Sequence, residues 1–151
     1  MGNIFLSVYT FNEYNKPENI IRKTVLKDSF IDIFLNIDWS QGTIHTYPNY
    51  PNEPRPKNHL FLFDIIKQTS LSFDIEVSND WAYEFILSFG NYQKESKSKY
   101  IGKIESFETS CYDENEMLNY IEDFFNRKYT TIKKLKNEAG IYHSHKFTFE
   151  L

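Results

Sequence analysis

The sequence predicts an α+β fold: a single domain, residues 1–151, built mainly on an antiparallel or mixed β-sheet with two helical segments. Three observations support this class. The chain has the length of one domain, 18% of its side chains are aromatic, and most apolar positions recur at every second residue. Consecutive strands with few helices between them disfavour a doubly wound sheet. We expect the helices at about 17–28 and 113–128, with an extension of the second to 139 left open.

The first third of the chain combines signals for strand and helix. Residues 4–11 are apolar and β-branched, which predicts a strand. Pro17 in a first helical turn, followed by apolar positions within 20–26, predicts the first helix. Apolar and polar residues then alternate from 30 to 39, which predicts a strand with one buried face. Together with residues 43–47 it forms the expected first hairpin.

The middle of the chain contains the clearest strand signal. Residues 47–57 hold four prolines and predict an irregular loop or a short polyproline II stretch. Residues 60–66 are apolar throughout, so periodicity alone allows a buried strand or a short helix. Residues 71–77 and 81–89 each carry large apolar side chains at every second position and are separated by polar turn residues. They predict a hairpin with one aromatic face.

The last third predicts a strand, a helical region and a terminal strand. A strand is expected near residues 100–109. Asp113 is the expected N-cap of the second helix, and Glu116 three residues later completes a capping box. Gly140 suits the position after a helix C-terminus. Alternation in residues 141–151 predicts the terminal strand.

The composition argues against several function classes. The net charge is −4 and the pI about 5.6, so a cationic partner is expected rather than nucleic acid or an anionic membrane. The single cysteine, Cys111, excludes an intramolecular disulfide, and the start of the chain lacks a signal-peptide pattern. No apolar run approaches the ~20 residues of a membrane-spanning helix. We therefore expect a cytoplasmic protein.

No catalytic motif accompanies the predicted elements. The five glycines are scattered, and neither a phosphate-binding loop nor a Gly-x-Ser-x-Gly elbow is present. His143 and His145 share one face of the terminal strand and could hold a metal, with His45 or His59 as a third ligand. This alternative is a small metal-dependent enzyme. Because the chain has no Cys pair and no His-Glu helix motif, we expect no enzyme, metal or cofactor.

Acidic residues are concentrated between Ile104 and Asn126, where seven carboxylates occur without a basic residue. One interpretation is complementation of the helix dipole together with solubility. The other is an anionic surface that speeds association with a basic partner and sets its specificity. Loop tyrosines can add contact area at low entropy cost. The expected partner-binding residues are Glu105, Glu108, Asp113, Glu114, Glu116, Glu122 and Asp123, with Tyr47 and Tyr50 from the loop.

In size, acidity, lone cysteine and aromatic-rich α+β pattern, the whole chain resembles the small immunity proteins of bacterial toxin–immunity systems, including contact-dependent growth inhibition. The resemblance implies a cytosolic protein that neutralises a cognate toxin, for example a nuclease, by tight binding that occludes a basic active site. A structural or phage-encoded interaction protein that assembles through a sheet edge is a further alternative.

Overall fold

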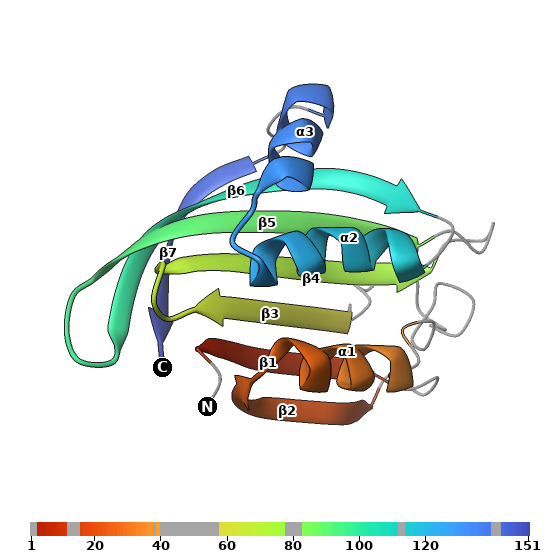
Figure 1. Ribbon diagram of the computed structural model, residues 1–151, viewed down its shortest axis with the longest axis horizontal. Helices are drawn as coiled ribbons and strands as arrows, with labels where there is room; N and C mark the ends of the chain where they lie inside the picture. The colour runs from red at the N-terminus through yellow and green to blue at the C-terminus, as the bar shows by residue number, and fades with distance from the viewer. Residues whose placement is uncertain are drawn as a thin grey trace.

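The computed structural model describes residues 3–11, 16–37, 39, 58–77, 83–111, 114–139 and 143–151. In these residues seven strands form one antiparallel sheet in the order β2-β1-β3-β4-β5-β6-β7 (Figure 1). The strands are β1 (Ile4–Phe11), β2 (Pro17–Val25), β3 (Asn58–Asp64), β4 (Thr69–Val77), β5 (Tyr83–Lys94), β6 (Lys99–Cys111) and β7 (His143–Glu150). The helices are α1 (Lys27–Asn36), α2 (Glu114–Phe125) and α3 (Thr130–Ala139). The predicted α+β class is confirmed.

The predicted first helix, at about 17–28, is wrong. Most of this segment is strand β2, which pairs with β1 from Pro17 opposite Phe11 to Val25 opposite Ile4. Proline is tolerated as the first residue of an edge strand, where its missing N–H leaves no ladder bond unmade. Pairing with β1 therefore outweighs the weak helical signal of Pro17.

The first helix is instead α1, in the segment where alternation predicted a strand at 30–39. Phe30 and Phe34 are both fully buried and lie four residues apart, on one face of this helix. The segment fits both the helical period of 3.6 residues and the strand period of two, because the apolar residues Ile31 and Ile33 lie between Phe30 and Phe34. The predicted strand is therefore wrong, and residues 43–47, its expected partner, lie outside the described residues.

The other predicted helices and strands that lie within the described residues are confirmed, whereas the predicted loop at 47–57 lies outside them. Strand β3 covers residues 60–64 of the apolar segment 60–66, so the strand alternative holds. The predicted second hairpin is β4 paired with β5, from Thr69 opposite Asn91 to Val77 opposite Tyr83. The second helix is α2, and the open extension to 139 is a separate helix, α3. Asp113, the expected N-cap, and Gly140 lie outside the described residues.

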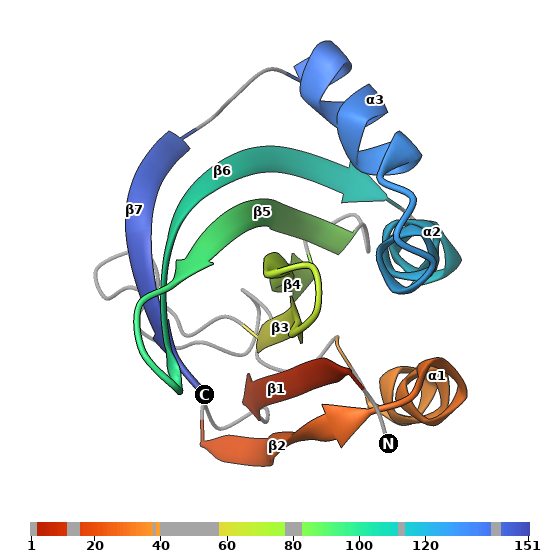
Figure 2. The same ribbon diagram turned by 60° about the vertical axis from the view of Figure 1, so that its left-hand side comes forward.

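All three helices lie on one face of the sheet, while β5 and β6 bend away from them toward β7 (Figure 2). The larger core lies between the helices and the sheet. Its largest fully buried side chains include Trp39, Phe30 and Phe124. Trp39 Nε1 donates to the Phe34 carbonyl oxygen at 3.0 Å, which holds the indole against the end of α1.

A second cluster of rings fills the opposite face, which we call the concave face. In a flat sheet β1 and β7 would be five strand spacings apart, about 24 Å. Yet the rings of Phe5 on β1 and Phe149 on β7 have centroids only 5.7 Å apart. The sheet must therefore curl until its last strand faces its first half. Phe63 lies at the centre of this cluster, fully buried, with ring centroids at 4.7 Å from Tyr100 and 5.0 Å from Phe149.

Within the concave cluster Tyr92 lies close to Gly102, its cross-strand neighbour on β6. A Cβ atom at position 102 would collide with the Tyr92 ring and would lie 2.6 Å from the Asn91 carbonyl oxygen. Glycine therefore lets the ring lie flat across β6. The Tyr92 hydroxyl is in turn 2.9 Å from Ser70 Oγ, within the buried cluster.

Tyr92 makes the fold less stable as the pH rises above ~10. Burial raises the pKa of Tyr92 above its ordinary value of 10.0, and the Ser70 hydrogen bond offsets part of that increase. The folded state then holds a proton that the unfolded state releases above about pH 10. This contribution to stability is complete below pH ~10 and is lost as the pH rises toward the pKa of the folded state.

We expect Tyr92→Phe to lower the free energy of unfolding by about 1 kcal/mol at pH 7, through loss of the Ser70 hydrogen bond. The difference from the wild type should shrink above pH ~10, because only the wild type has this proton to lose. Urea unfolding at pH 7, 9, 10 and 11 measures it. A difference that stays constant across this series would show that Tyr92 does not titrate as described.

Candidate functional site

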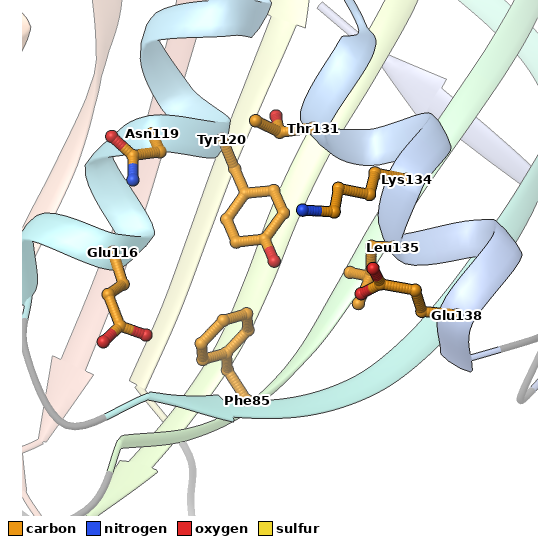
Figure 3. Close-up of a pocket in the computed structure, with 8 residues that line it drawn as sticks. All are labelled: Phe85, Glu116, Asn119, Tyr120, Thr131, Lys134, Leu135 and Glu138. Atoms are coloured by element: carbon orange, nitrogen blue, oxygen red, sulfur yellow. The ribbon is translucent and has the colours of Figure 1, made fainter.

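A groove between α2 and α3 brings predicted site residue Glu116 together with groups that are distant in sequence (Figure 3). We call it the α2–α3 groove, and its volume is about 220 Å³. Helix α2 contributes Glu116, Asn119 and Tyr120 to its wall. Phe85 reaches it from β5, and α3 contributes Thr131, Lys134, Leu135 and Glu138.

The helices are positioned by their apolar faces. Met117, Ile121 and Phe124 of α2 are fully buried against the sheet, which leaves Glu116 and Asn119 exposed at the groove. On α3, Ile132 and Leu135 are the buried anchors. The groove-lining positions of both helices therefore follow from helical spacing around these anchors.

Aromatic rings form the centre of the groove. Tyr120 packs against Phe85 at 6.2 Å and against Phe73 at 6.4 Å between ring centroids. Figure 3 shows Tyr120 and Phe85 between Glu116 on one side and Glu138 on the other, with the Lys134 side chain directed toward Tyr120. The groove thus offers aromatic surface with one carboxylate from each helix, and Lys134 is the basic group in its lining.

The Asp123 and Glu105 carboxylates have partners within the chain. Asp123 Oδ2 accepts a hydrogen bond from the Thr131 backbone N–H at 3.0 Å, so it caps the first turn of α3. Glu105 Oε2 lies 2.9 Å from Lys136 Nζ, which joins β6 to α3. Both groups stabilise the placement of α3.

Of the remaining predicted residues that the structure describes, Glu108 and Glu122 do not line the groove with Glu116. Glu108 is exposed on β6, on the concave side, since its neighbour Phe107 points into the helix-side core. Glu122 is exposed on α2 and does not line the α2–α3 groove. The side chain of Glu114 is outside the described part, as are Asp113, Tyr47 and Tyr50.

Sequence reasoning missed Glu138 and Tyr120. A signal for them was present: Tyr120 follows Glu116 by four residues, so both lie on one helix face. On α3, residues 131, 134, 135 and 138 recur at helical spacing and also share a face. What the sequence lacked was the relative placement of the two helices.

The concave face has a second opening, which we call the concave hollow, with a volume of about 320 Å³. On one side His59 Nδ1 lies 2.7 Å from Asp74 Oδ1. On another, the rings of His143 and His145 stack with centroids 4.8 Å apart. The predicted pair of histidines thus faces the same hollow as His59, while His45 is outside the described residues.

Metal binding needs several ligands that converge on one point. Among the described residues, no group of three or more His, Cys, Asp or Glu side chains is arranged to hold a metal ion. Within the same residues, no helix has the length and apolar character needed to cross a membrane.

Comparisons of the chain with protein-family models, with curated proteins and with solved structures found no match.

Proposed function

We propose that this chain is a non-catalytic binding protein, a cytoplasmic immunity protein that neutralises a bacterial toxin by covering a basic active site. The α2–α3 groove is the surface that we assign to this contact. The toxin is of the kind that binds an anionic substrate, as a nuclease does, because such an enzyme must expose lysine and arginine side chains.

The observation that carries the proposal is the composition of the α2–α3 groove. Glu116 and Glu138 are exposed and flank the partly exposed ring of Tyr120, while Phe85, which packs against Tyr120, is buried. An arginine or lysine side chain from a partner can lay its apolar stem or cationic head on an aromatic face and pair its charge with a carboxylate. Tyrosine at the centre with charged groups around it is the usual arrangement of an interface hot spot.

Glu116 and Glu138 also provide the negative charge that we expect at a surface that binds a basic partner. The net charge of −4 attracts a basic partner at long range, and local carboxylates orient it. Asp123 and Glu105 support this surface indirectly, because their bonds to α3 hold Glu138 opposite Glu116.

Reversal of the groove charges tests the proposal. We expect the double variant Glu116→Lys and Glu138→Lys to bind the cognate toxin about 100-fold more weakly, since like charges would then face each other across the interface. The partner to use is each toxin domain encoded beside the gene, and isothermal titration calorimetry measures the Kd. In the same assay the wild type should suppress the toxin activity at equimolar ratio.

The matched control is Glu18→Lys with Glu150→Lys, two exposed residues on the edge strands β2 and β7. Both double variants change the net charge by the same amount, so general electrostatics affects them equally. The control should keep its Kd within about threefold of the wild type at physiological salt, because screening weakens distant charges. Equal losses in the two variants, or no binding to any of these toxin domains, would contradict the proposal.

A further inference from the structure

We propose that the concave hollow is a binding site for a small neutral aromatic molecule that carries a hydroxyl or N–H donor, with phenols as the representative class. The site is independent of the α2–α3 groove and lies on the opposite face of the sheet. The proposal rests on the size of the hollow, its aromatic wall, its lack of free charge and the fixed orientation of His59.

The hollow has the dimensions of a small-ligand site. Its volume of about 320 Å³ is at the lower end of the range of about 300–1,000 Å³ typical of ligand pockets. Phe61 and Phe147 line it with ring centroids 6.4 Å apart and a tilt of 46°. Phe147 remains 37% exposed although it belongs to this aromatic wall. Ile86 and Ile104 complete the apolar lining, so a flat apolar ring has surfaces to pack against.

The curl of the sheet brings the histidines of two distant strands to one hollow. Strands β3 and β7 cross rather than run side by side (Figure 1). His59 precedes Phe61 by two residues on β3, and His145 precedes Phe147 by two on β7, so each histidine shares a strand face with its phenylalanine. The two phenylalanine rings contact each other, and both histidines line the same hollow.

The lining lacks a free charge that would select an ionic ligand. None of its described side chains is a lysine or arginine, and its one carboxylate, Asp74, is paired with His59. The hydroxyls of Ser88 and Ser106 lie 2.8 Å apart, so that one donates to the other, and neither group carries a charge. A phosphate or carboxylate ligand would find no strong counter-charge here, which favours a neutral molecule.

Asp74 sets the hydrogen-bonding role of His59. An ionised carboxylate only accepts hydrogen bonds, so His59 Nδ1 donates to Asp74 Oδ1 at 2.7 Å. In the tautomer with the proton on Nδ1, Nε2 is the acceptor of the ring, and within the described residues Nε2 has no hydrogen-bond partner. A half-exposed pair of this kind adds little to folding stability. A hydroxyl or N–H group on the ligand supplies the donor that Nε2 lacks.

Titration with 4-ethylphenol, followed by backbone amide chemical shifts, tests the site. We expect saturable shifts in residues 59–61, 86–88, 104–106 and 143–147. Ethylbenzene has nearly the same shape but no hydroxyl, and we expect it to bind at the same residues about tenfold more weakly. The difference between the two probes reports the hydrogen bond to His59.

The double variant His59→Phe and Asp74→Leu keeps a flat ring and removes both the acceptor and the carboxylate that would otherwise be left unpaired in the hollow. It should lower the affinity for 4-ethylphenol about tenfold, to that of ethylbenzene, and leave ethylbenzene binding unchanged. Unchanged ethylbenzene binding shows in the same sample that the hollow is still formed. The proposal is overturned by the absence of saturable shifts, by shifts at other residues, or by equal affinity of the wild type for both probes.

Discussion

Replacement of Phe63 by alanine is expected to lower the free energy of unfolding by about 3–5 kcal/mol, because it removes a fully buried ring and leaves a cavity. The cavity would lie at the centre of the cluster that joins β3 to β7 across the curl, where Phe63 meets Tyr92, Tyr100 and Phe149. We therefore also expect β7 to lose its tertiary support. Urea unfolding measures the first effect, and native-state hydrogen exchange in residues 143–150 measures the second.

Phe30→Ala provides a matched control. Phe30 is also fully buried, but it packs against Phe34 and Phe125 in the helix-side core. We expect a similar loss of stability, about 3–5 kcal/mol, without selective exchange in β7. If both variants increased exchange in β7 equally, or if Phe63→Ala cost less than ~1 kcal/mol, Phe63 would not hold the curl.

Arg127→Met is expected to lower the free energy of unfolding by about 3 kcal/mol, because it leaves a buried carboxylate without its cation. Asp64, at the end of β3, is fully buried. It receives hydrogen bonds from Arg127 Nε at 2.8 Å and from the backbone N–H groups of Ile66 and Lys67 at 3.0 Å each. The hydrogen bond to Asp64 also raises the pKa of Arg127, so the guanidinium stays charged. Thermal or urea unfolding measures the loss.

The backbone of Arg127 allows a second comparison. Its φ of 55° lies in the left-handed region, directly after α2, a position that glycine occupies with less strain. Arg127→Gly should therefore be about 1 kcal/mol less destabilising than Arg127→Met. Adding Asp64→Asn to Arg127→Met should recover part of the loss, because a neutral amide needs no cation. If Arg127→Met were as stable as the wild type, the ion pair would not support the junction of β3 and α2.

The sequence predicts those elements whose signals are local and agree with one another. Residues 71–77 and 81–89 carry large apolar side chains at every second position around a polar turn, and the structure pairs 71–77 with 83–89 in strands β4 and β5. Residues 113–128 carry apolar side chains at helical spacing, and α2 lies within them. The strand period of two dominates in the first case, and the helical period of 3.6 dominates in the second.

The helix predicted at 17–28 and the strand predicted at 30–39 are wrong because the local signals in these segments are ambiguous. Ile20 and Ile21 are adjacent, so they can serve one face of a helix or opposite faces of a strand. Edge strand β2 has mostly exposed side chains, which removes the alternation that marks a strand. Phe30 and Phe34 fit both periods, and only their burial in the core shows the segment to be helical.

The candidate sites depend on non-local geometry. His59 and Asp74 are direct cross-strand neighbours on β3 and β4, but the sequence left β3 undecided between strand and helix. Glu116 and Glu138 line the same groove because Asp123 and the buried face of α3 fix the position of α3 relative to α2. The curl follows from ring packing between strands at opposite ends of the sheet order, and sequence periodicity carries no information about it.

Hydrogen–deuterium exchange of the chain, alone and mixed with each candidate toxin domain encoded beside its gene, tests the proposed binding surface most directly. We predict slower exchange on binding in residues 114–125 and 130–139, the helices that form the α2–α3 groove, and no change in residues 59–63 and 143–150. Protection confined to β3 and β7, with the two helices unchanged, would place the partner on the concave face and contradict the proposed function.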